Sequence, residues 1–141
     1  MIGINPYLNF SNNCEEVFNF YKSVFGGEFS SKMKFKDVPS EYQMSPSESE
    51  KIMHIALPIG KNSVLMGSDV PEKMGHPVTG SNFNLSISVE SEKEADRLFK
   101  GLSAGGKVTM PLSKTFWGSY FGMFEDKFGI SWMINYDYPK K

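Results

Sequence analysis

The sequence has few of the features that mark large classes of protein. It contains a single cysteine, Cys14, so it cannot form an internal disulfide, which fits a reducing cytoplasm. It has no run of about 18 apolar residues, which predicts no membrane-spanning helix. The N-terminus lacks a basic segment followed by an apolar one, so no secretion signal is predicted. We therefore expect a cytoplasmic protein without a membrane partner.

Excess charge and catalytic signatures are also missing. The formal net charge is −1 and the basic residues are scattered, so we expect no nucleic-acid partner. There is no nucleophile elbow, Walker loop, GxGxxG dinucleotide fingerprint or HExxH zinc motif. The residues therefore indicate no catalytic group and no cofactor, and leave open whether the protein is an enzyme.

The most informative stretch is Trp117–Tyr136, which predicts a β-hairpin. Two aromatic-rich strands, Ser119–Glu125 and Ile130–Tyr136, flank the connection Asp126–Gly129, whose glycine suits a turn. Neither face of the second strand is charged, which is typical of a strand covered on both sides. Its two faces are Trp132, Ile134 and Tyr136 on one side, and Ser131, Met133 and Asn135 on the other.

The first half of the chain predicts one set of strands around an amphipathic helix. Cys14, Val17, Phe18 and Tyr21 recur at helical spacing behind a capping box that begins at Asn13. The predicted elements are a strand at Ile2–Phe10, a helix ending at Gly26–Gly27, a strand at Glu28–Lys36, a polar loop at Asp37–Glu50, and a hairpin of Lys51–Ile59 and Ser63–Asp69.

The second half repeats this pattern after a turn-rich linker, Val70–Ser81. A second capping box starts at Ser91, 78 residues after Asn13, and a second helix ends at Gly105–Gly106. The other predicted elements are strands at Asn82–Glu90 and Lys107–Leu112 and the hairpin described above. A repeat matched in kind and order predicts two βαβββ modules, residues 1–69 and 82–141, in one domain.

Several short segments together resemble the vicinal-oxygen-chelate superfamily of glyoxalases, bleomycin-resistance proteins and extradiol dioxygenases, and its PhnB-like branch. These segments are Pro6–Phe10, Phe20-Tyr21, Phe25–Gly27, His54, Leu65–Asp69, Trp117-Gly118 and Asp126–Trp132. The resemblance implies an α+β fold in which two βαβββ modules form curved mixed sheets with the helices on the convex face. It also implies a cavity on the other face and a homodimer.

The resemblance further implies metal-ligand positions on the first, fourth, fifth and eighth strands. In this sequence they fall at Pro6 or Tyr7, within Met66–Ser68, at Asn84 and at Met133. Proline has no donor atom, methionine suits soft metals and a lone asparagine is weak, so we predict no bound metal.

These considerations predict metal-free binding of a small apolar or aromatic molecule. The expected lining is Tyr7, Asn9, His54, Met66, Ser68, Asn84, Trp117 and Met133. For His54 a hydrogen-bonded position in the core is an open alternative. Two other functions also remain open: a metal-dependent or His-assisted lyase, isomerase or dioxygenase, and a protein-interaction domain.

A few residues are expected to have structural or solvent-exposed positions only. Cys14 lies on the apolar stripe of the first helix and is expected to be buried. Asp126 is expected to stabilise the hairpin turn. His76 and the acidic segment Glu48–Glu50 are expected to be solvated.

Overall fold

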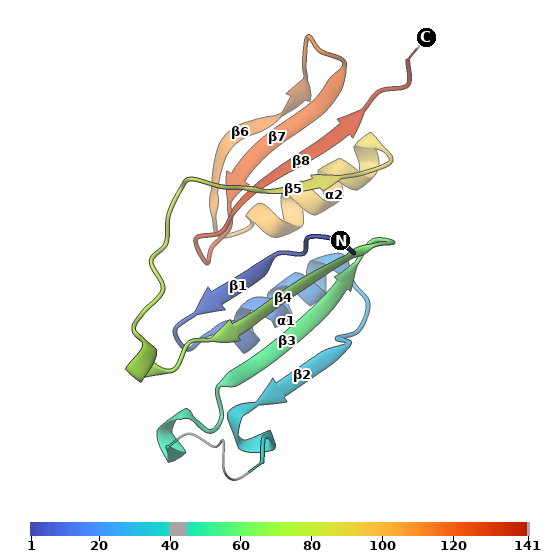
Figure 1. Ribbon diagram of the computed structural model, residues 1–141. Helices are drawn as coiled ribbons and strands as arrows, with labels where there is room; N and C mark the ends of the chain where they lie inside the picture. The colour runs from blue at the N-terminus through green and yellow to red at the C-terminus, as the bar shows by residue number, and fades with distance from the viewer. Residues whose placement is uncertain (40–44, 141) are drawn as a thin grey trace. The chain divides into compact units, whose positions relative to one another are not determined.

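The computed structural model describes residues 1–39 and 45–140, and these confirm the predicted α+β class (Figure 1). The chain divides into two compact units, Met1–Val78 and Thr79–Lys141, which we call the first and second modules. The division falls inside the predicted linker, which contains a short 3₁₀ turn, η4 (Glu72–Met74). No helix among the described residues is long and apolar enough to cross a membrane.

The first module is a four-stranded mixed sheet with one α-helix. The strand order is β1-β4-β3-β2, with β1 parallel to β4 and the other pairs antiparallel. The elements are β1 (Tyr7–Phe10), α1 (Cys14–Phe25), β2 (Ser31–Lys34), the 3₁₀ turns η1 (Phe35–Asp37) and η3 (Pro46–Glu48), β3 (Ile52–Ile59) and β4 (Ser63–Asp69).

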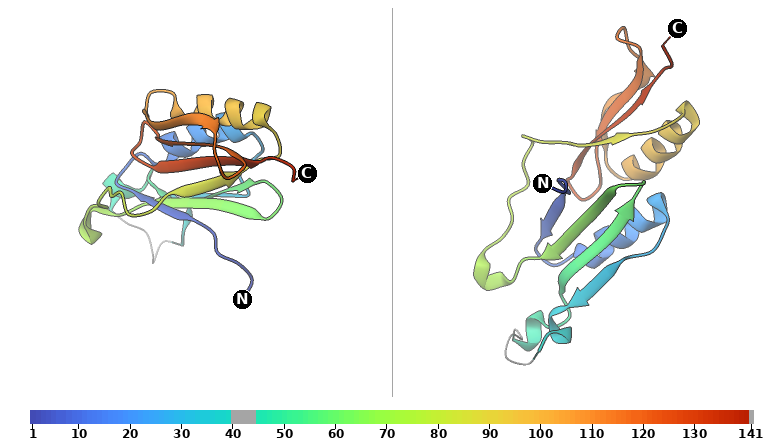
Figure 2. Two further views of the ribbon diagram at one scale, coloured as in Figure 1. Left: turned by 90° about the horizontal axis from the view of Figure 1, so that it is seen from above. Right: turned by 45° about the vertical axis from the view of Figure 1, so that its right-hand side comes forward.

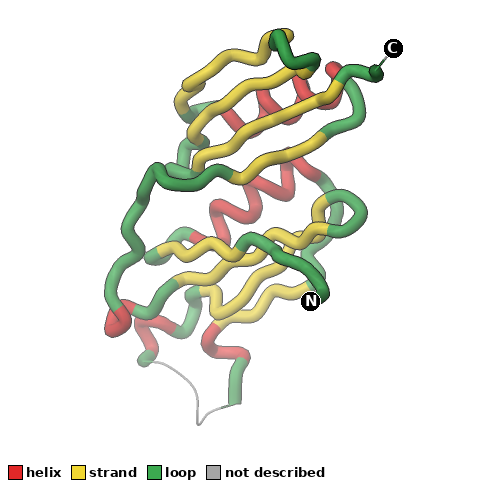
Figure 3. Tube along the Cα trace, turned by 45° about the horizontal axis from the view of Figure 1, so that its top comes forward, coloured by secondary structure: helices red, strands yellow, loops and turns green. Residues whose placement is uncertain are grey.

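The second module has the same topology, which confirms the predicted repeat (Figure 3). Its strand order is β5-β8-β7-β6, again with the first strand of the module parallel to the last. The elements are β5 (Leu85–Ser88), α2 (Glu92–Ser103), β6 (Lys107–Lys114), β7 (Ser119–Glu125) and β8 (Ser131–Asp137). The two four-residue strands β1 and β5 start 78 residues apart, as do the two helices.

In each module the helix covers one face of its own sheet (Figure 2). A glycine lets a helix phenylalanine approach the sheet closely. A Cβ at Gly67 would lie 2.6 Å from the Phe18 ring, and one at Gly122 would lie 2.7 Å from the Phe99 ring. The fully buried side chains between helix and sheet include Val17, Tyr21, Ile55, Leu57, Leu102 and Ile134.

Three predicted strands are much shorter in the structure, and β3 starts at Ile52, one residue later than predicted. The strand predicted at Ile2–Phe10 starts only at Tyr7, directly after Pro6, which has no N–H to donate to a neighbouring strand. The strands predicted at Glu28–Lys36 and Asn82–Glu90 shrink to β2 and β5. By contrast, β6 extends the predicted Lys107–Leu112 to Lys114, and β8 lies one residue later than predicted.

The capping box predicted at Asn13 is wrong. The Asn13 side chain makes no capping hydrogen bond. Instead, Asp69 at the end of β4 accepts from the Cys14 N–H through Oδ1 at 2.9 Å and from the Ile52 N–H through Oδ2 at 2.9 Å. A distant carboxylate therefore replaces the local cap. In the second module Ser91 does cap its helix, accepting from the Glu94 N–H at 3.1 Å.

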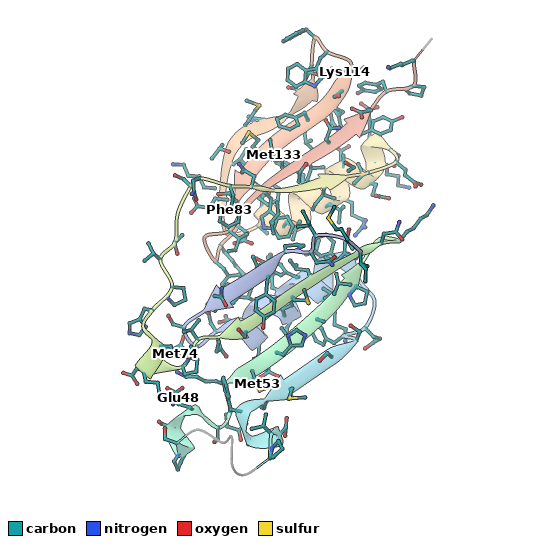
Figure 4. The ribbon with its side chains drawn as sticks, viewed as in Figure 1. Glu48, Met53, Met74, Phe83, Lys114 and Met133 are labelled. Atoms are coloured by element: carbon teal, nitrogen blue, oxygen red, sulfur yellow. The ribbon has the colours of Figure 1, made fainter. Side chains whose placement is uncertain are left out.

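The acidic segment Glu48–Glu50 is not simply solvated, so that expectation is wrong for Glu48. This side chain is 7% exposed; it accepts from the Glu72 N–H at 3.0 Å and pairs with Lys51 Nζ at 2.6 Å. It thereby connects η3 to η4, and Figure 4 shows Glu48 and Met74 at the same end of the first module. Residues 40–44 of the predicted loop lie outside the described residues.

Candidate functional site

The face of the first sheet turned away from α1, which we call the first distal face, holds the site residues predicted in this module. Leu8 and Gly67, which are partners between β1 and β4, are buried against α1. Because side chains alternate along a strand, their neighbours point to the opposite face. The predicted residues there are Tyr7 and Asn9 on β1, Met66 and Ser68 on β4, and His54 on β3.

Tyr7 and His54 contact each other on the first distal face. The Tyr7 hydroxyl lies 3.3 Å from His54 Nδ1, and the two ring centroids are 5.7 Å apart. Tyr7 is 43% exposed and His54 is half-buried. The next residue on β3, Ile55, is fully buried on the helix side of the sheet. Because side chains alternate, His54 points to the other face and is not part of the helix–sheet core.

Other residues of the first distal face were missed by the sequence reasoning. Met33 is the β2 partner of His54, and Ser31 is the β2 partner of Ala56. Ala56 is in turn the β3 partner of Met66. Alternation within the segment Glu28–Lys36 is weak, so only the pairing of β2 with β3 reveals these neighbours.

The second module presents a corresponding distal face, turned away from α2, which carries Met133. This residue lies on β8 between its partners Ser86 on β5 and Met123 on β7 (Figure 4). Its neighbours Trp132 and Ile134 are buried at 2% and 0% exposure, which confirms the predicted division of the two strand faces. Met133 itself is half-buried.

The other two predicted residues of this module lie outside its strands. Asn84 was expected within a strand, but it is exposed and precedes β5. Trp117 lies in the turn between β6 and β7 and is 56% exposed. Its ring contacts Phe116 and Phe121 in edge-on geometry, with centroid distances of 4.9 Å and 6.1 Å. Phe121 follows the same parity as Met123, so Trp117 borders the second distal face.

Several expected structural roles are confirmed. Asp126 holds the hairpin connection: its carboxylate accepts from the Phe128 and Ile130 N–H groups at 2.9 and 3.1 Å and from Trp132 Nε1 at 2.8 Å. Cys14 is fully buried, and its burial, together with nearby Asp69, raises the pKa of its thiol. A thiol held protonated in this way is a poor nucleophile.

The residues at the superfamily's ligand positions do not fit a divalent metal. None of Pro6, Tyr7, Met66–Ser68, Asn84 and Met133 supplies a carboxylate or imidazole donor. Within residues 1–39 and 45–140, no three histidine, cysteine, aspartate or glutamate side chains come together in a way that could hold a metal ion.

The duplicated βαβββ topology and these sheet faces define a glyoxalase-like protein. The sequence matches the profile of the Glyoxalase/Bleomycin resistance protein/Dioxygenase superfamily over residues 3–134, and the chain belongs to this superfamily.

Individual relatives cover nearly the whole chain. Protein YjdN of Escherichia coli K12 is 32% identical over 140 residues, which span 94% of this chain and 93% of YjdN. The crystal structure of protein PA1353 from Pseudomonas aeruginosa is 39% identical with a TM-score of 0.85, covering 97% of this chain and 98% of that one. The PhnB protein from Bacillus cereus is 27% identical with a TM-score of 0.75, covering 94% and 98%. This similarity supports the resemblance to the PhnB-like branch.

Proposed function

We propose that this protein binds a small apolar or aromatic molecule, without a metal, on the first distal face. The observation that carries the proposal is the Tyr7–His54 contact on a sheet face that the helix does not cover. Small-molecule sites combine apolar lining with a few placed polar groups. Met66 supplies a soft apolar surface, while Asn9 and Ser68 lie side by side in register as hydrogen-bonding groups.

Predicted residues of the second module extend this proposal to a second apolar surface. Met133 and Met123 are partners on adjacent strands, and Trp117 borders the same face. Thioether and aromatic side chains adapt to varied ligands. Asn84 remains a proposed lining residue even though it precedes β5.

A thermal-shift screen of small aromatic molecules tests the binding proposal. A ligand present at 100 times its dissociation constant adds about 2.7 kcal/mol to the free energy of unfolding. We expect the shift to shrink in Tyr7→Ser and His54→Phe and to persist in His76→Gln. His76 is the matched control, because it is an exposed histidine of the same module whose one hydrogen bond, to Ser11, lies outside the site. A shift that survives both site substitutions would place the ligand elsewhere.

A His-assisted lyase or isomerase is the second candidate, favoured by the same contact. Histidine is the side chain that most often acts as a general acid or base. Turnover of a bound ligand that disappears in His54→Ala would establish this activity. Elemental analysis of untagged protein would test the metal-dependent version, which requires stoichiometric metal.

The proposal includes a homodimer. Apolar side chains remain exposed in both modules, among them Met33 at 37% and Val108 and Met110 at 45% each. Exposed apolar side chains of this kind are often covered by a partner subunit. Sedimentation equilibrium measures the mass in solution directly, and a monomer at all concentrations would contradict this part of the proposal.

A further inference from the structure

The first distal face has a distinctive charge pattern. On the opposite face, Lys32 of β2 pairs with Glu15 of α1, so the lysine side chain lies with the helix. Lys34 shares that parity and pairs with Glu50. None of the strand residues that the register places on the distal face is a lysine, arginine, aspartate or glutamate. These residues are Tyr7, Asn9, Ser31, Met33, His54, Ala56, Pro58, Val64, Met66 and Ser68.

Among these strand residues, His54 is therefore the one whose side chain can carry a positive charge. Its Nδ1 atom faces the Tyr7 hydroxyl at 3.3 Å. A phenol is a good donor and a neutral imidazole nitrogen a good acceptor, so this contact favours the tautomer with the proton on Nε2. If His54 is protonated instead, Nε2 also carries a proton. In both states Nε2–H is available to donate to a bound molecule.

We propose that the ligand of the first distal face is an aromatic carboxylic acid, bound as its anion. This inference rests on the proposed binding function and names its ligand class. One carboxylate oxygen accepts from His54 Nε2–H, and the Asn9 amide and Ser68 hydroxyl provide further donors. The aromatic ring packs on Met66 and Tyr7.

Charge complementarity selects the anion over other aromatic molecules. These strand residues include no carboxylate. The face therefore neither repels an anionic ligand nor attracts a cationic one. A hydrogen bond to a charged acceptor is stronger than one to a neutral acceptor. A neutral aromatic keeps the apolar contacts but loses this contribution.

The test compares 2-naphthoate with 2-naphthamide, which share a ring system and differ in charge. Isothermal titration calorimetry at neutral pH should show naphthoate binding about tenfold or more tightly than naphthamide. In His54→Phe the preference should fall to about twofold or less, because naphthoate loses more affinity than naphthamide does. Phenylalanine is a suitable replacement because it keeps a planar ring and removes both ring nitrogens.

Two further variants keep the result interpretable. His54→Gln retains a neutral donor, so it should lower the preference for naphthoate less than His54→Phe does. Tyr7→Phe removes the hydroxyl that favours the Nε2–H tautomer and should also reduce the preference; its side chain is 43% exposed, so this change leaves the fold intact. Circular dichroism melting verifies folding of each variant.

The possible outcomes separate the two proposals. Equal affinity for both probes in the unmodified protein would overturn the anionic ligand and leave binding on this face standing. Preference for naphthoate that is unchanged in His54→Phe would also overturn it. Binding of neither probe to folded protein would overturn both this inference and the aromatic-binding function on which it rests.

Discussion

The two modules share one topology but begin their helices in different ways. In the first module α1 is capped by Asp69, a carboxylate at the end of β4 that also accepts from the Ile52 N–H at the start of β3. In the second module α2 is capped by its own preceding residue, Ser91. One side chain therefore ties three elements together in the first module. The cap of the second module is a local contact of the helix with itself.

The distal faces differ in a similar way. A helix-facing row crosses three strands in each module: Leu8–Gly67–Ile55 in the first and Ile87–Ile134–Gly122 in the second. The distal face of the first module carries Tyr7, His54 and Met66, and that of the second carries Ser86, Phe121 and Met133. The first distal face thus has a polar contact pair, whereas the second has thioether and aromatic side chains.

The largest difference should appear on removing the two helix caps. We expect Asp69→Ala to lower the free energy of unfolding by about 3 kcal/mol, because it leaves two buried N–H groups without an acceptor. Ser91→Ala should cost about 1 kcal/mol. Urea unfolding measures both values. Asp69→Asn keeps one carbonyl acceptor, so its loss of unfolding free energy should lie between those of the two alanine variants. Equal losses for Asp69→Ala and Ser91→Ala would contradict the difference between the two caps.

The close approach of helix to sheet should be similarly sensitive in both modules. Gly67→Ala and Gly122→Ala should each cost about 2 kcal/mol, because the new Cβ collides with a phenylalanine ring and with backbone atoms. Gly80→Ala is the control, since its Cβ meets nothing closer than 3.7 Å. Thermal unfolding of the three variants provides the measurement. A near-neutral Gly67→Ala would show that α1 packs more loosely than the structure indicates.

Acid should weaken the first module through its glutamate–lysine pairs. Hydrogen bonding to Lys51 lowers the pKa of Glu48, and hydrogen bonding to Lys36 and Lys34 lowers that of Glu50. A lowered pKa in the folded state means that the stabilisation is present above the ordinary value of 4.5 and is lost as the pH falls below it. Glu48→Gln should reduce this pH dependence in urea unfolding measured at successive pH values. If stability depends on pH in Glu48→Gln as it does in the unmodified protein, the Glu48–Lys51 pair does not contribute to acid sensitivity.

Alkali should have a smaller effect through two tyrosines of the second module. Hydrogen bonding to Asp96 on α2 raises the pKa of Tyr120 to about 12. Burial, and hydrogen bonding to Glu92 on the same helix, raise the pKa of Tyr138 to about 12. Stabilisation by a raised pKa is present below the ordinary value of 10 and lost as the pH rises towards 12. Tyrosinate absorbance during a pH titration should show late-ionising groups that disappear in Tyr120→Phe and Tyr138→Phe.

Much of the fold was predictable because its signals are local. Apolar residues at helical spacing, paired glycines after each helix and the Asp126–Gly129 connection located both helices and both hairpins. The bounds of β4 and β7 agree with the prediction residue for residue. The strands β1, β2 and β5 were predicted too long, because the local sequence does not show where pairing with a neighbouring strand begins and ends.

The candidate site was predictable only in part. Strand parity and the family resemblance selected Tyr7, His54 and Met66, which do share the first distal face. Asn84 was placed on a strand that starts one residue later. Met33 was missed, because its place beside His54 depends on how β2 pairs with β3.

By itself, the sequence determined the kinds of element, their order and the duplication of the module, because helix periodicity and turn residues act over a few positions. Only the tertiary structure decided that Asp69, rather than Asn13, caps α1, since this carboxylate is 55 residues from Cys14 along the chain. The tertiary structure also decided that Tyr7 and His54 meet. They lie on strands separated by β4, and contact between them depends on strand order and register, which no local pattern encodes.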